Sequence, residues 1–95
     1  MRKLACRTAV DCGAEGFASF DLQYVPTQRC IETRSFGRHL SHLLETRALD
    51  QALLRQIVAD VMECCRPSMA RVKAQFESAA NRGVSLSWNS EEATQ

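Results

Sequence analysis

The fold of this chain is decided by the stretch Arg29–Leu40, which reads Arg-Cys-Ile-Glu-Thr-Arg-Ser-Phe-Gly-Arg-His-Leu. Before it, residues 17–25 alternate apolar and polar side chains, a pattern typical of a half-buried strand. Beyond its midpoint, apolar residues recur at helical spacing, as Phe36, Leu40 and Leu43. The stretch therefore marks the change from a strand to an amphipathic helix.

The start of this expected helix carries the first indication of a function. Thr33 or Ser35 can cap it, because a short hydroxyl side chain accepts a hydrogen bond from a free first-turn N–H group. Glu32, Arg34 and Arg38 crowd the same end, where the helix dipole is positive. Free N–H groups beside cationic side chains predict a phosphate site, and a solvated, charged helix end is the alternative interpretation.

The composition predicts a single small domain over residues 1–90, followed by a disordered polar tail at 91–95. A chain of 95 residues has a thin core, which oligomerisation would help to stabilise. Its 12 basic and 11 acidic residues are interspersed, which argues against direct contact with nucleic acid or a membrane surface. Five cysteines and no apolar leader predict free thiols in the cytoplasm. No apolar run approaches the roughly 18–20 residues that span a bilayer.

Further elements follow from the same patterns. Residues 3–11 alternate like a strand that has Cys6 on its apolar face, and a glycine-containing turn returns the chain as a hairpin. Asp50 is a good N-cap for a second helix, which Pro67 brings to an end at Arg66. The expected elements are strands 3–11 and 17–25, helices 33–46 and 51–66, and strands 68–78 and 84–88.

This order, ββααββ, predicts an α+β domain in which one antiparallel sheet carries both helices on its apolar face. We expect the long strand at 68–78 to present an open edge. Exposed edges are normally covered or paired, and closing a ring of subunits into a barrel is one solution. The sequence therefore predicts a homo-oligomer.

The central stretch resembles the 7-cyano-7-deazaguanine reductases, the NADPH-dependent nitrile reductases of queuosine biosynthesis, a tRNA-modification pathway. Their motif Glu-Ser-Lys-Ser-x-Lys-Leu-Tyr is similar to residues 32–39, which read Glu-Thr-Arg-Ser-Phe-Gly-Arg-His. Their strand ending in Tyr-Ile-Pro is similar to Tyr24-Val25-Pro26, and their Arg-Gly-Gly-Ile-Ser-Ile to residues 82–86, Arg-Gly-Val-Ser-Leu. The resemblance covers residues 4–90 and implies the tunnelling fold, whose ββααββ subunits assemble into barrel-shaped rings.

The resemblance also implies roles for particular residues. In the family a cysteine thiolate adds to the nitrile carbon, a carboxylic acid manages protons, and NADPH supplies two hydrides. The implied nucleophile and acid are Cys6 and Glu15, with Cys12 and Asp11 as alternatives. The implied cofactor-binding residues are Glu32, Arg34, Ser35 and Arg38, and the implied substrate-binding residues are Asp50, Gln51, Arg82 and Gly83.

The chain departs from the family pattern at several positions. Ala9 stands where the family has its nucleophilic cysteine, and Gly16 where it has its catalytic aspartate. Gly37 replaces the second lysine of the cofactor motif. The family's His-Glu pair, which holds the base, falls on Asp50-Gln51. Gln51 can donate as well as accept, whereas an ionised glutamate only accepts, and Asp50 has the alternative role of a helix cap.

Several candidate residues have purely structural alternatives. Cys6 shares a strand face with apolar neighbours, and cysteine is often a small buried hydrophobe. Cys64 and Cys65 are expected to pack in the core. His39 and His42 have no supporting ligands at metal-binding spacing, so we expect an exposed helix face and no metal.

Two functional hypotheses of different classes follow. The first is a cytoplasmic, NADPH-dependent reductase that acts on a small deazapurine-like nitrile and assembles into a homo-oligomeric ring. The second is a non-catalytic tunnelling-fold protein that binds a purine- or pterin-like molecule or serves as an assembling scaffold.

Overall fold

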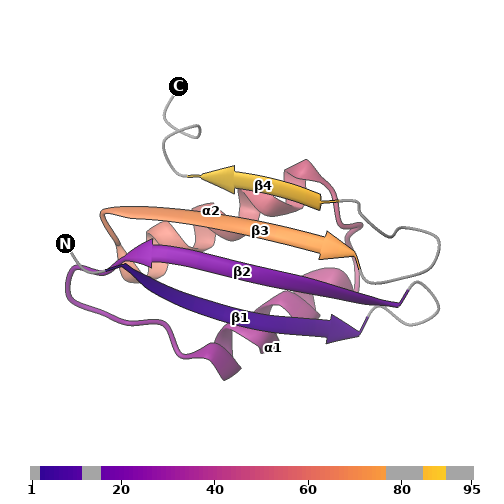
Figure 1. The fold of residues 1–95 in the computed structure, drawn as a ribbon, viewed down its shortest axis with the longest axis horizontal. Coiled ribbons are helices and arrows are strands. Elements are labelled where there is room, and N and C mark those ends of the chain that lie inside the picture. The colour runs from indigo at the N-terminus through magenta and orange to yellow at the C-terminus, as the bar shows by residue number, and fades with distance from the viewer. Residues whose placement is uncertain (1–2, 12–15, 77–84, 90–95) are drawn as a thin grey trace.

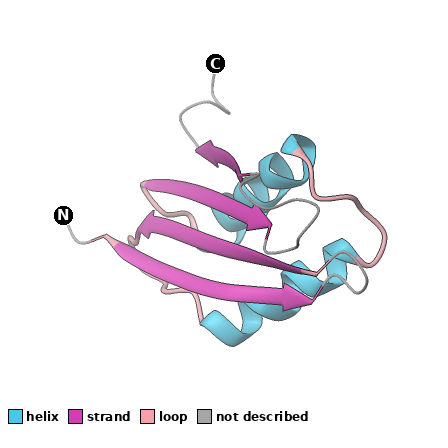
Figure 2. Ribbon diagram, turned by 45° about the vertical axis from the view of Figure 1, so that its right-hand side comes forward, coloured by secondary structure: helices cyan, strands magenta, loops and turns pink. Residues whose placement is uncertain are grey.

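The computed structural model describes residues 3–11, 16–76 and 85–89 of the chain. It confirms the predicted order ββααββ, with four strands in one layer and both helices on the same side of the sheet (Figure 1 and Figure 2). The elements are β1 (Leu4–Asp11), β2 (Phe17–Val25), α1 (Thr33–Leu44), α2 (Gln51–Cys65), β3 (Met69–Phe76) and β4 (Ser85–Asn89).

The four strands pair antiparallel in the order β1-β2-β3-β4. On the side that faces the helices, one row of paired residues crosses the whole sheet as Cys6, Leu22, Val72 and Trp88. Because β3 pairs with a strand on each side, the prediction of an open edge at residues 68–78 is wrong. Among the described strands, the edges of the sheet are β1 and β4. The prediction failed because the alternation within a strand does not encode which other strands it pairs with.

The opposite face of the sheet is polar, and one of its rows reads Arg7, Asp21, Lys73 and Ser87. Arg7 Nε lies 3.7 Å from Asp21 Oδ1. This face is hollowed by about 630 Å³ and carries small side chains, among them Ala9. The alternation of apolar and polar residues therefore separates a core face from a solvated face, as the sequence predicts.

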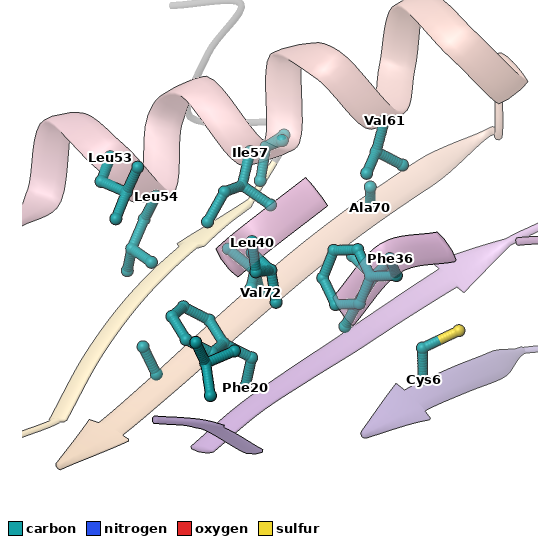
Figure 3. Packing of buried hydrophobic residues seen from close by; sticks show 14 of the residues in the cluster. Cys6, Phe20, Phe36, Leu40, Leu53, Leu54, Ile57, Val61, Ala70 and Val72 are labelled. Carbon is teal, nitrogen blue, oxygen red and sulfur yellow. The ribbon is translucent and has the colours of Figure 1, made fainter. Parts of the chain in front are cut away.

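The core lies between the sheet and the two helices (Figure 3). From α1 only Phe36 and Leu40 are buried, and this helix packs against β1. From α2 five residues are buried, and this helix packs against β3 and β4. The buried residues of α2 are Leu53, Leu54, Ile57, Val58 and Val61. The two helices are thus held very unequally.

The helix ends follow from local chemistry. Asp50 is the N-cap of α2, as predicted, and its Oδ1 accepts from Leu53 N at 2.9 Å. At the other end Arg66 adopts a left-handed conformation with φ 48°, directly before Pro67. Helix α1 ends at Leu44, two residues earlier than predicted, because the following residues form a tightened turn with bonds from Glu45 N to His42 O and from Thr46 N to Leu43 O.

Candidate functional site

The N-cap residue of α1 differs from the predicted one. Glu32 occupies the N-cap position in an extended conformation, so neither Thr33 nor Ser35 is the cap, because Thr33 is already helical. Within the described part of the chain, the Glu32 side chain makes no capping bond to α1; its Oε2 accepts instead from Ser35 Oγ at 3.1 Å. Arg34 and Arg38 are exposed on the first two turns of α1. The first N–H groups of α1 therefore lack a carboxylate cap and lie among cationic side chains.

Ile31, the residue before the N-cap of α1, is hydrogen-bonded to strands β2 and β1. Ile31 N donates to Tyr24 Oη at 2.8 Å, and Ile31 O accepts from Cys6 Sγ at 3.5 Å. Burial raises the pKa of Tyr24 above its ordinary value of 10.0, although the bond from Ile31 partly opposes the shift. The phenol therefore stays neutral at physiological pH and accepts the Ile31 bond in that form.

Gly37, which replaces the second lysine of the family's cofactor motif, lies where α1 approaches β1 closely. A Cβ at this position would lie 3.3 Å from Thr8 Oγ1, which is tighter than ordinary contact. The absence of a side chain thus lets the second turn of α1 lie against β1.

Cys6, the predicted nucleophile, lies on β1 directly beside the residue that precedes α1. It is 3% exposed and belongs to the core cluster, at whose margin Figure 3 shows it. Cys12 and Glu15 lie outside the described residues, while Asp11 ends β1. The structure places Cys6 Sγ against Ile31 O, directly before the residues predicted to bind the cofactor, while Glu15, the predicted acid, lies outside the described residues.

Two of the predicted substrate-binding residues, Asp50 and Gln51, lie at the start of α2. The Asp50 side chain serves as the helix cap, which is the alternative that the sequence left open. Gln51 Nε2 donates to Ser87 O on β4 at 2.7 Å. Beside it, the Arg55 guanidinium stacks over the Trp88 ring at 4.9 Å, a cation–π contact. Arg82 and Gly83 lie outside the described residues.

The two groups of candidate residues lie at opposite edges of the sheet. Cys6 is on edge strand β1, and Gln51 is bound to edge strand β4, with β2 and β3 between them. Three strand spacings amount to roughly 14 Å. The hydrophobic core fills the space between the edges on the helix side. Within one chain, the thiol and the predicted base-binding residue are therefore separated by the core.

A groove of about 280 Å³ runs between α1 and α2. In it His39 Nε2 lies 2.7 Å from Asp60 Oδ2, and Asp60 Oδ1 accepts from Gln56 Nε2 at 2.7 Å. His42 is exposed, as expected, whereas His39 is half-buried and its ring is bound to α2. Sequence reasoning missed this pair because its members are 21 positions apart, which no local pattern connects.

The expected core packing of the adjacent cysteines is also wrong. Cys64 is exposed and Cys65 is half-buried, and Arg29 of the loop before α1 donates to Cys64 O at 3.5 Å. Within residues 3–11, 16–76 and 85–89, no group of three or more His, Cys, Asp or Glu side chains is arranged to hold a metal ion. Neither of the two described helices is long and apolar enough to cross a membrane.

Comparison with known proteins confirms the resemblance. The chain matches the family described as QueF-like protein over residues 16–95. It is similar to NADPH-dependent 7-cyano-7-deazaguanine reductases of Nitrosococcus oceani (33% identity over 64 residues) and Alkalilimnicola ehrlichii (30% over 64 residues). Each alignment covers 67% of this chain and 50% of the relative, so the chain spans about half the length of these curated relatives. The family match begins after Cys6, Cys12 and Glu15.

Proposed function

The chain belongs to the QueF-like family, and from this membership we propose that it acts as an NADPH-dependent reductase of a 7-cyano-7-deazaguanine-like nitrile. The observation that carries the proposal is the family match over residues 16–95, which includes the start of α1. The exposed guanidinium groups and free N–H groups there suit a phosphate-bearing cofactor. A cytoplasmic location suits a protein with free thiols.

Each part of the cofactor motif has a role in the proposal. Arg34 and Arg38 would hold the NADPH phosphates, and the Glu32 carboxylate, already bonded to Ser35, would accept from a sugar hydroxyl. When bound, NADPH supplies the hydride for reduction. The chain's own task is to place the cofactor above β1, next to a thiol.

The nucleophile in the proposal is Cys6. Its thiolate would add to the nitrile carbon and form a thioimidate, which a carboxylic acid, assigned to Glu15, would protonate. Cys6 is favoured by its position beside Ile31, directly before the cofactor motif. Because it is 3% exposed, the nitrile can reach it only when the contact with Ile31 opens.

The separation of the two groups supports a site built between subunits. Pairing β1 of one subunit with β4 of the next would satisfy both edges and close a ring. The same pairing would carry the partner subunit's Gln51 toward Cys6 and the α1 start. Arg82 and Gly83, which precede β4 in the chain, would belong to the substrate side of this site.

The proposal is tested by covalent capture of the substrate. Without NADPH, 7-cyano-7-deazaguanine should add once per chain, because thioimidate formation needs a bound nitrile and a thiolate but no hydride. Intact-mass spectrometry should show this addition in the wild type and in Cys12→Ala, and its loss in Cys6→Ala. Arg34→Ala should keep the adduct but bind NADPH about 10- to 150-fold more weakly, since it loses a charge-assisted contact.

The other outcomes are equally informative. An adduct on Cys12 would keep the enzyme and reassign its nucleophile. No adduct at saturating nitrile, with folded protein, would contradict the reductase and leave the non-catalytic hypothesis.

A further inference from the structure

The groove between α1 and α2 adjoins the residues that are proposed to bind the cofactor phosphates. Ser35, whose hydroxyl is bonded to Glu32 at the start of α1, is also part of the groove wall. Ile31, directly before the N-cap of α1, lines the groove as well. The groove is therefore continuous with the α1 start, and a ligand held at that start can extend into it.

The walls and the size of the groove suit a flat apolar group. Phe36 of α1 and Val61 of α2 form its walls together with Ile31. Phe36 and Val61 are 4% and 6% exposed, so the core fixes both walls in place. The groove volume of about 280 Å³ lies at the lower end of the roughly 300–1,000 Å³ that is typical of small-molecule sites. It therefore suits a single ring system and not a whole dinucleotide.

The groove also offers one open hydrogen-bonding group, on His39. Its Nε2 lies 2.7 Å from Asp60 Oδ2, while Gln56 Nε2 donates to Asp60 Oδ1 at 2.7 Å. An ionised carboxylate only accepts, so Nε2 carries the proton and Nδ1 is the acceptor of the neutral imidazole. Among the described residues, His39 Nδ1 has no hydrogen-bond partner. Apolar walls and one acceptor complement an aromatic heterocycle that carries an amino group.

The position of the groove determines which end of NADPH it can hold. Helix α1 packs against β1 and α2 against β3 and β4, so the groove lies on the side of α1 that is away from the β1 edge (Figure 1). The proposed nucleophile, Cys6, lies on β1, where the nicotinamide must meet the nitrile. Nicotinamide and adenine stand at opposite ends of the NADPH phosphates. Phosphates bound at the α1 start therefore direct the adenine toward the groove.

We propose that the groove between α1 and α2 binds the adenine ring of NADPH. This inference rests on the proposed function, because it takes NADPH as the cofactor. Phe36 and Val61 contact the ring, and the adenine amino group donates to His39 Nδ1. The α1 start then holds the phosphates between an adenine on its α2 side and a nicotinamide on its β1 side.

The first experiment uses adenosine 2′,5′-bisphosphate, the half of NADPH that carries adenine but no nicotinamide. By calorimetry it should bind the wild-type chain and compete with NADPH. Bound adenosine 2′,5′-bisphosphate should also slow alkylation of Cys64, which lines the groove, by several-fold. Cys30 is the internal control, because it is exposed and does not line the groove, so its alkylation rate should not change.

Three variants test the groove itself. Cys64→Trp fills it from the exposed last turn of α2 and should weaken NADPH and adenosine 2′,5′-bisphosphate alike, by about 5- to 150-fold. Glu63→Trp places the same bulk on the neighbouring exposed position, outside the groove, and should bind both ligands as the wild type does. His39→Ala loses the acceptor and should bind both about 2- to 12-fold more weakly. Circular dichroism confirms that each variant is folded.

The remaining outcomes overturn the proposal. Normal binding in Cys64→Trp, or unchanged alkylation of Cys64, would show that adenine lies elsewhere. Weaker binding of NADPH alone would place the nicotinamide in the groove. A wild-type chain that forms the nitrile adduct and binds NADPH, but whose groove variants also bind normally, contradicts only this inference. A wild-type chain that does not bind NADPH contradicts the reductase function as well.

Discussion

The two helices begin in opposite ways, and the difference indicates where a ligand can bind. The start of α2 is completed by its own chain, because Asp50 caps Leu53 N and Gln51 is bonded to β4. The start of α1 has Glu32 at the N-cap without a capping bond, and it is held by the backbone of Ile31 instead. A helix start whose N–H groups are satisfied is fixed structure, whereas one without a carboxylate cap can accept an anion.

The helices also differ in how firmly they are attached. Five buried residues anchor α2, but α1 has only Phe36 and Leu40. The helix that is assigned the cofactor is thus the one held by fewer buried side chains. Elements that bind ligands are commonly drawn from the less stable parts of a fold.

The largest expected effect is obtained by removing an anchor of α1. Phe36→Ala should lower the free energy of unfolding by about 3–5 kcal/mol, because it opens a cavity under a helix with one other buried side chain. Hydrogen exchange should then show α1 losing protection before α2. The control is Leu54→Ala on α2, which should cost about 2–5 kcal/mol without loosening α1 selectively. Equal loss of protection in both helices after Phe36→Ala would refute the unequal attachment.

A smaller effect is expected from removing the N-cap side chains, and it compares the two helix starts directly. Asp50→Ala should lower the free energy of unfolding by about 0.5–2 kcal/mol, because Leu53 N loses its partner. Glu32→Ala should change it by less than about 0.5 kcal/mol, since Glu32 makes no capping bond. Asp50→Asn is the control that keeps the cap. Chemical denaturation of all three variants at one protein concentration makes the comparison, and an equal loss at both positions would contradict it.

The smallest effect is confined to alkaline pH and concerns Tyr24, the only tyrosine of the chain. Burial raises the pKa of this phenol above 10.0 in the folded protein. Its contribution to stability is therefore complete below pH 10.0 and is lost as the pH rises through the folded pKa, because the unfolded chain releases its proton first. Phenolate absorbance should show titration above 10.0 in the folded protein and near 10.0 in denaturant. Coincident titrations would contradict the buried phenol beneath α1.

Local sequence patterns predicted the helices and strands well, whereas features that depend on long-range contacts were not predicted. Alternation over residues 17–25 and the helical spacing of Phe36 and Leu40 gave the correct buried faces, because burial imposes the period of each element on its own sequence. The Asp50 cap was predictable because its partner is three residues away.

The candidate site was less predictable, because its features depend on contacts between residues that are far apart in the sequence. The bond between His39 and Asp60, the edges at β1 and β4, and the exposure of Cys64 all depend on which segments meet in space. The family resemblance at residues 32–39 could be recognised in the sequence, but the separation of Cys6 from Gln51 by the core could not.

Mixing of two variant subunits tests most directly whether the site is built between chains. Cys6→Ala and Gln51→Arg should each form no adduct with 7-cyano-7-deazaguanine when assembled alone. Co-assembled in equal amounts, they should restore about one quarter of the wild-type adduct, because some interfaces would combine an intact Cys6 with the partner subunit's intact Gln51. The adduct should lie on the Gln51→Arg chain. A mixture without adduct, or an adduct on Gln51→Arg assembled alone, would contradict a site shared between the β1 edge of one subunit and the β4 edge of the next.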